Sequence, residues 1–154
     1  MLPKHILVPT DLSEGAEQAL DYACELARTV GARIHLLTVI GIPALGVPEL
    51  GLAVTTTVID QLVVESQEAI DRLARTRCNA PVGEVLVRSG DARDVINQTA
   101  SELNIDLIVM GTHGRRGIAR ALLGSVAETV VRTAPCAVLT VRLRELDDHG
   151  RHAA

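Results

Sequence analysis

Hydrophobic residues occur along this chain in two alternating patterns. Short continuous apolar runs predict buried strands at residues 6–8, 34–40, 82–87, 107–110 and 137–141. Between these runs, apolar residues recur every three or four positions, which predicts helices. We expect these helices from Ser13 to Gly31, from Val58 to Thr76, from Gly90 to Leu103 and from Ser125 to Thr133.

Strands that alternate with helices predict a single α/β domain, in which helices cover both faces of a parallel sheet. Ser13 is placed to cap the first helix and Gly31 to end it. Residues 41–53 contain three glycines and two prolines, so we expect an irregular loop there. Its leucines and valines indicate that this loop packs against another surface.

Two polar segments directly follow predicted strands. They are Pro9-Thr10-Asp11 and Gly111-Thr112-His113-Gly114. In open parallel sheets, ligands bind beyond the carboxyl ends of the strands, where the strand order reverses. If the first and fourth strands are neighbours, these segments form the two walls of one crevice.

The second of these segments begins a glycine pattern: Gly111-x2-Gly114-x9-Gly124-Ser125, which ends where a helix begins. Glycine permits positive φ and close approach of a ligand to the backbone. The N–H groups of the following helix present partial positive charge to an anion. The pattern therefore predicts a phosphate-binding loop and makes a nucleotide the first hypothesis.

Two better-known phosphate loops are absent. The chain contains no Gly-Lys pair, which the P-loop of nucleoside-triphosphate hydrolases requires, and no G-x-G-x-x-G dinucleotide fingerprint. The segment after the first strand contains no glycine before Gly15. The predicted phosphate loop is therefore of a different kind.

In this form the glycine pattern resembles the ATP-binding branch of the universal stress protein family. The segments 6–11, 90–92 and 134–138 match the family in the same order. The resemblance implies a Rossmann-like sheet of strand order 3-2-1-4-5 over residues 1–141, a charged tail at 142–154 and a homodimer joined through the last strand. It implies ATP bound by Asp11, by backbone near Val39 and by the glycine loop. We therefore predict a nucleotide site made of Pro9, Thr10, Asp11, Val39, Met110, Gly111, His113, Gly114, Gly124, Ser125 and Val126.

Several of these residues also have a purely structural interpretation. Asp11 either contacts the nucleotide or a magnesium ion, or caps the first helix together with Ser13. Val39 is an ordinary core valine apart from the resemblance. Ser125 and Glu128 match a capping box, which competes with phosphate for the serine hydroxyl but leaves the backbone N–H groups available.

The polar residues of the glycine loop also have two interpretations. Thr112 and His113 either touch phosphate or face solvent. The same choice applies to the three arginines between the glycines, Arg115, Arg116 and Arg120.

Composition excludes some functions. A net charge of −4 and a single aromatic residue, Tyr22, argue against nucleic-acid binding. There is neither a signal-peptide pattern nor an apolar run of membrane-spanning length, so we expect a cytoplasmic protein with no membrane contact. The three cysteines, Cys24, Cys78 and Cys136, lack metal or redox spacing and are expected as reduced, buried hydrophobes.

The histidines do not indicate a metal site. We expect His35 to be a satisfied sheet residue, and His149 and His152 belong to the predicted tail.

These observations predict an ATP-binding stress-response module, with Mg²⁺ accompanying the nucleotide, that acts as a dimer and signals to an unidentified protein partner. The loop at 41–53 is a candidate for the element that changes state. No general base or nucleophile is evident, so at most slow ATP hydrolysis or autophosphorylation is expected.

Other functions on the same fold are less consistent with the sequence. The His-x-Gly-His signature of adenylating enzymes is missing after the first strand, and a flavin site would lack flanking aromatics. A dimeric scaffold without nucleotide is the remaining alternative, and the intact glycines argue against it.

Overall fold

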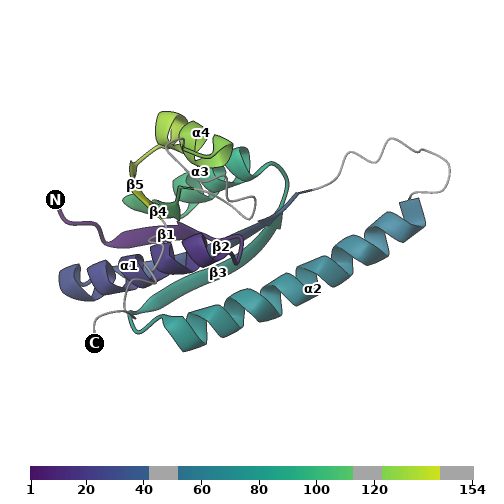
Figure 1. Cartoon of the computed structure of the whole chain (residues 1–154), viewed down its shortest axis with the longest axis horizontal. Coiled ribbons are helices and arrows are strands. Elements are labelled where there is room, and N and C mark those ends of the chain that lie inside the picture. The colour runs from purple at the N-terminus through teal and green to yellow at the C-terminus, as the bar shows by residue number, and fades with distance from the viewer. Residues whose placement is uncertain (42–51, 113–122, 143–154) are drawn as a thin grey trace, which may run out of the picture.

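The polypeptide folds into a five-stranded sheet with four helices among the described residues (Figure 1). The computed structural model describes residues 1–41, 52–112 and 123–142. In chain order the elements are β1 (His5–Pro9), α1 (Glu14–Val30), β2 (Arg33–Ile40), α2 (Leu52–Arg77), β3 (Val82–Ser89), α3 (Ala92–Glu102), β4 (Leu107–Gly111), α4 (Ser125–Thr133) and β5 (Ala137–Val141).

All strand pairs are parallel, and the strand order is β3-β2-β1-β4-β5. This confirms the predicted fold class and order. The central strand β1 pairs with β2 on one side and β4 on the other. Its residues Ile6, Leu7 and Val8 are all fully buried, which is why the sequence there is a continuous apolar run.

The helices divide evenly between the two faces of the sheet (Figure 1). Ile6, Val8, Ile34 and Leu36 face α1 and α2, whereas Leu7, Leu37 and Ile108 face α3 and α4. The core is aliphatic on both faces. In α2, the buried residues that the structure describes are all near the C-terminal end, at Ile70, Leu73 and Ala74.

The ends of α1 form as the sequence predicts. The Ser13 hydroxyl accepts a hydrogen bond from the Ala16 N–H at 3.4 Å, so it caps the helix N-terminus. Gly31 ends the helix with φ of 73°, a left-handed conformation that glycine adopts without steric cost.

Two predictions about helix starts were wrong. Helix α2 begins at Leu52, six residues before the predicted start and within the segment expected to be a loop; the rest of that loop, 42–51, lies outside the described residues. The residues from Val54 to Thr57 are all β-branched, and their low helix propensity hid the helix in the sequence.

The predicted capping box of α4 is also wrong. Gly124 is the N-cap residue and Ser125 is already the first helical residue, so Ser125 and Glu128 are each one position too far into the helix. The Glu128 N–H donates to the Gly124 carbonyl at 2.8 Å, and the Glu128 carboxylate pairs with Arg132 at 2.9 Å. The helix has no side-chain cap.

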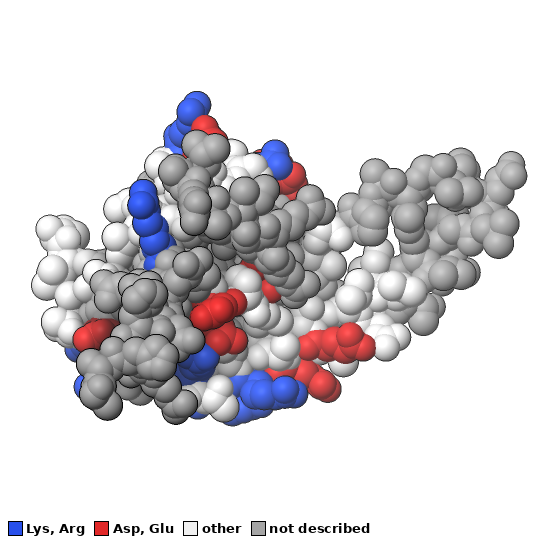
Figure 2. Space-filling view, viewed as in Figure 1, with Lys and Arg blue, Asp and Glu red and all other residues white. Residues whose placement is uncertain are grey.

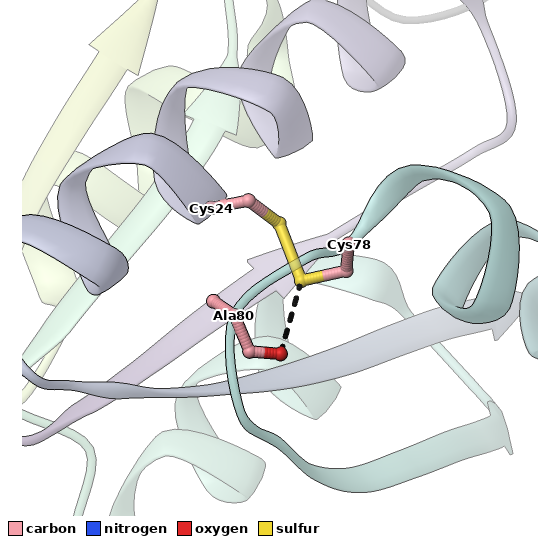
Figure 3. The surroundings of a disulfide bond; sticks show 3 residues. All are labelled: Cys24, Cys78 and Ala80. Carbon is pink, nitrogen blue, oxygen red and sulfur yellow. Dashed lines mark hydrogen bonds between the residues drawn. A yellow bond between two sulfur atoms is a disulfide. The ribbon is translucent and has the colours of Figure 1, made fainter.

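The prediction of three reduced cysteines was wrong for two of them. Cys24 of α1 and Cys78, which follows α2, form a disulfide (Figure 3). They are 54 residues apart in sequence, so their pairing depends on how α1 and α2 pack and leaves no trace in cysteine spacing. Cys24 is buried as predicted, and Cys136 is a free, half-buried thiol.

His35 is a satisfied residue of the sheet, as predicted. It is buried on β2, and its Nδ1 accepts a hydrogen bond from the Glu84 N–H at 3.1 Å. An accepting ring nitrogen carries no proton, so the ring proton is on Nε2 and donates to Nδ1 of His5 at 3.1 Å. The pKa of His35 is lowered, first by burial and next by the neighbouring His5, while Glu84 opposes the shift and Arg33 adds to it.

This arrangement predicts a pH-dependent stability. A histidine with a lowered pKa in the folded state is protonated first in the unfolded chain, so stability is complete above its ordinary value of 6.5 and falls as the pH decreases below it. Urea unfolding of the wild type between about pH 7.5 and about pH 5.5 should show this decrease. His35→Gln, which cannot titrate, should show a smaller decrease. An equal pH dependence in both proteins would contradict the assignment.

Candidate functional site

The pairing of β1 with β4 brings the two predicted site segments to one edge of the sheet. Ile6 pairs with Leu107 and Leu7 with Ile108, so both strands end at the same carboxyl edge. The strand order reverses between these two strands, which is where parallel sheets bind ligands. Pro9-Thr10-Asp11 and Met110-Gly111-Thr112 are therefore close in space, as predicted.

The turn between β1 and α1 is fixed to the end of β2. The Thr10 N–H donates to the Leu37 carbonyl at 2.8 Å, and the Thr38 hydroxyl donates to the Thr10 carbonyl at 3.1 Å. Both threonines are buried. Thr38 was not among the predicted site residues; the signal that could have found it is a hydroxyl residue within the apolar second half of β2.

Asp11 has a structural role in this turn. Its Oδ1 accepts hydrogen bonds from the N–H of Ser13, at 3.0 Å, and from the Ser13 hydroxyl. Between the two, Leu12 has a positive φ of 62°, which is unusual for a residue with a side chain. Asp11 thus stabilises the turn that precedes α1, whereas the N-cap itself is Ser13, so Asp11 supports the cap residue in place of the shared capping that the structural alternative predicted. The hydrogen bonds to Ser13 orient the Asp11 side chain, which follows the C-terminal end of β1.

Gly111 is required for packing. A Cβ atom added there would lie 3.1 Å from the carbonyl oxygen of Gly15, in the first turn of α1. Neither Gly111 nor Gly124 has positive φ, so that part of the predicted reason for these glycines was wrong. The missing Cβ instead lets the start of α1 approach the end of β4.

The two ends of the glycine pattern meet. The Gly124 N–H donates to the Thr112 carbonyl at 2.8 Å, and the Thr112 N–H donates to the Val141 carbonyl at 3.1 Å. These bonds fix the start of α4 beside the ends of β4 and β5. In this link the N–H of Gly124 already donates to a carbonyl oxygen of the chain.

Of the remaining predicted residues, some belong to the described part of the chain and others do not. Val39 is half-buried near the end of β2 and packs against the core on the α3–α4 face, and Met110 is buried. His113, Gly114 and the three loop arginines lie outside the described residues.

The described residues, 1–41, 52–112 and 123–142, contain neither a metal-binding cluster nor a membrane-spanning helix. No group of three or more histidine, cysteine or acidic side chains is placed to bind a metal ion. Within the same ranges, no helix has the length and apolar composition needed to cross a membrane.

Comparison with known proteins identifies the family. The model of the universal stress protein family matches residues 3–142. The chain belongs to the universal stress protein family. Among curated members, universal stress protein A homolog 1 of Coxiella burnetii is 33% identical over 143 residues, which cover 92% of this chain and 98% of that protein.

Solved structures of universal stress proteins share the fold. UspA from Lactobacillus plantarum is 28% identical with a TM-score of 0.76, and the match covers 90% of this chain and 97% of that one. The universal stress protein from Archaeoglobus fulgidus in complex with dAMP is 26% identical with a TM-score of 0.54, covering 91% and 98%.

The contact at Gly111 predicts the effect of a small substitution. Gly111→Ala should lower the free energy of unfolding by about 1–3 kcal/mol, because the methyl group meets the backbone of α1. Gly41→Ala is a matched control: it lies at the same edge of the sheet, no atom of the described residues lies within 4 Å of the added Cβ, and it should change stability little. Urea unfolding monitored by circular dichroism measures both. Equal stability of the two variants would contradict the packing role.

Proposed function

We propose that this universal stress protein binds an adenine nucleotide, ATP together with Mg²⁺, at the carboxyl edge of β1 and β4. The observation that carries the proposal is the hydrogen bond from Gly124 to Thr112, which holds the start of α4 at the end of β4, and β4 is paired with the strand that leads into the β1–α1 turn. A helix N-terminus at a strand-order reversal is a favourable position for phosphate. The dAMP bound by the Archaeoglobus fulgidus relative supports a nucleotide as ligand.

Each predicted residue has a proposed role in this site. The N–H groups of Ser125 and Val126 donate to phosphate oxygens, and Gly114 and His113 complete the phosphate loop. Asp11 accepts a hydrogen bond from the ribose, and the backbone at Val39 contacts the adenine edge. Pro9, Thr10, Met110 and Gly111 form the floor, with Gly124 holding α4 in register. Mg²⁺ binds to the phosphate oxygens of the nucleotide and to water.

We further propose that the bound nucleotide regulates a protein partner in the cytoplasm. Asp11 is engaged with Ser13, and the proposed phosphate donors are backbone groups. Such a site favours binding over strong catalysis, because neither the engaged Asp11 nor the backbone N–H groups provide a general base. The exposed charges agree with a protein or small-molecule ligand: on the face shown in Figure 2, acidic and basic side chains of the described residues are mixed, whereas nucleic-acid binding would favour a continuous basic surface.

A homodimer through β5 is the proposed assembly. Strand β5 is at one edge of the sheet, and its residues are half-buried or exposed in the single chain. An unpaired strand edge is a template for pairing with a second copy, which would bury these residues.

Ser125 allows the phosphate contacts to be tested separately from the fold. Ser125→Pro removes the proposed N–H donor, and proline is tolerated at the first position of a helix, particularly after the extended Gly124. Loss of one hydrogen bond to a charged phosphate should weaken ATP binding by roughly 10- to 100-fold. Isothermal titration calorimetry with Mg²⁺ and ATP, and with AMP and dAMP for comparison, measures the change.

Ser125→Ala is the matched control, because it removes the hydroxyl and keeps the N–H. It should bind ATP nearly as well as the wild type. If the proline variant keeps its circular dichroism spectrum and binds as tightly as the alanine variant, the assignment of this N–H is wrong. Absence of ATP binding by the wild type would refute the proposed function itself.

Sedimentation velocity tests the assembly. The wild type should sediment with twice the chain mass of 16.4 kDa. Thr140→Lys, which places a charge on the edge strand, should shift the protein toward the monomer. A wild type that sediments as a monomer at every concentration would contradict the dimer.

A further inference from the structure

The disulfide between Cys24 and Cys78 lies where α2 is attached to the rest of the domain. Cys24 is in the second half of α1, and Cys78 follows Arg77, the last residue of α2 (Figure 3). The buried residues described in α2, Ile70, Leu73 and Ala74, lie within the preceding two turns. The bond therefore joins α1 to the part of α2 that contacts the core.

Besides the disulfide, ion pairs at the surface connect the end of α2 to α1. Arg77 pairs with Asp21 at 2.9 Å and with Glu17, both on α1. The side chain of Arg77 is 42% exposed, and those of Glu17 and Asp21 are 32% and 48% exposed. Exposed pairs contribute little to stability, and salt weakens them.

We propose that Cys24 and Cys78 form a reversible thiol–disulfide site, whose oxidation state sets how firmly the C-terminal end of α2 is held to α1. The co-reactant is a dithiol, either a small molecule or a protein. The proposal does not depend on nucleotide binding, because it concerns other residues and another part of the domain.

The surroundings of both sulfur atoms suit the reduced state as well as the oxidised one. Cys24 is 2% exposed and packs among aliphatic residues of α1 and α2, an environment in which a thiol behaves as a small hydrophobe. The Sγ of Cys78 lies 3.9 Å from the carbonyl oxygen of Ala80 (Figure 3). A disulfide has no S–H, so this carbonyl can accept a hydrogen bond from Cys78 only after reduction.

The difference in burial fixes the order of the exchange. A thiolate of the dithiol attacks Sγ of the half-buried Cys78, the S–S bond breaks, and Cys24 leaves and takes up a proton. The second thiol of the reagent then attacks the reagent's other sulfur, which is bonded to Cys78 in the mixed disulfide. Cys78 is released as a thiolate and takes up the second proton. Two electrons and two protons pass to the protein, and the dithiol becomes a disulfide.

Reduction changes what holds the junction together. In the oxidised protein α1 and α2 are joined covalently, and salt cannot weaken that bond. In the reduced protein the ion pairs of Arg77 with Glu17 and Asp21 remain, and salt weakens them. Because such exposed pairs contribute little, loss of the covalent bond is the main effect of reduction, and a larger effect of salt on the reduced protein accompanies it.

The test combines thiol counting with amide hydrogen exchange on the full-length protein. Wild type is equilibrated in mixtures of reduced and oxidised dithiothreitol, quenched with acid, unfolded in denaturant, alkylated and analysed by mass spectrometry, so that the burial of Cys24 does not limit its alkylation. Cys24 and Cys78 should become reactive together in one two-electron transition, whereas Cys136 should react independently. In the reduced protein, exchange at residues 72–80 should be about tenfold faster than in the oxidised protein, and faster still in high salt.

Two variants complete the test. Cys78→Ser should exchange at the fast, salt-sensitive rate under all redox conditions, and Cys136→Ser should behave as wild type. If Cys78→Ser does not fold, the reduced wild type provides the same comparison. The proposal would be overturned if Cys24 and Cys78 were alkylated separately. It would also be overturned if the two cysteines stayed unpaired in oxidised dithiothreitol. Exchange rates that are identical in the two oxidation states would overturn it as well.

Discussion

The parallel pairing of β1 with β4 is the constraint on which the rest of this structure depends. It places at the centre of the sheet a strand whose three middle residues are fully buried, and the strand order reverses beside it. The pairing is secured where both strands begin: the carboxylate of Asp106 accepts hydrogen bonds from the backbone N–H groups of Lys4 and His5, which lower the pKa of Asp106. Every segment of the candidate site follows one of these strands or their neighbours.

At the opposite edge, close packing of backbones maintains the same arrangement. Gly111 lets the first turn of α1 approach the end of β4, and Asp11 with Ser13 defines how the chain enters that turn. These positions are set by main-chain atoms and short side chains, which have few conformations to lose. Preorganised donors lose less freedom on binding than flexible ones do.

The sequence was sufficient to predict the parts of the fold that depend on local pattern. The run Ile6-Leu7-Val8 and the alternation of strands with helices led to the correct fold class, and the family resemblance supplied the strand order. The helix end at Gly31 followed from one residue's backbone preference. The site segments also met as expected, because the first and fourth strands are neighbours.

Features that depend on distant contacts could not be predicted in this way. The partner of Cys24 is set by the packing of α1 against the end of α2. The role of Gly111 depends on a carbonyl nearly a hundred residues earlier in the chain. Helix α4 begins one residue earlier than the capping box predicted, with Gly124 as its N-cap, and the link from Gly124 to Thr112 is a long-range contact that the sequence around Ser125 does not signal.

That bond between Gly124 and Thr112 has a consequence for how such a domain evolves. It ties the start of α4 to the end of β4 through main-chain atoms alone. Every residue except proline offers the same backbone donor and acceptor, whatever side chain it carries. The position of α4 therefore tolerates changes of side chain at this junction better than it would if the link were made by side chains.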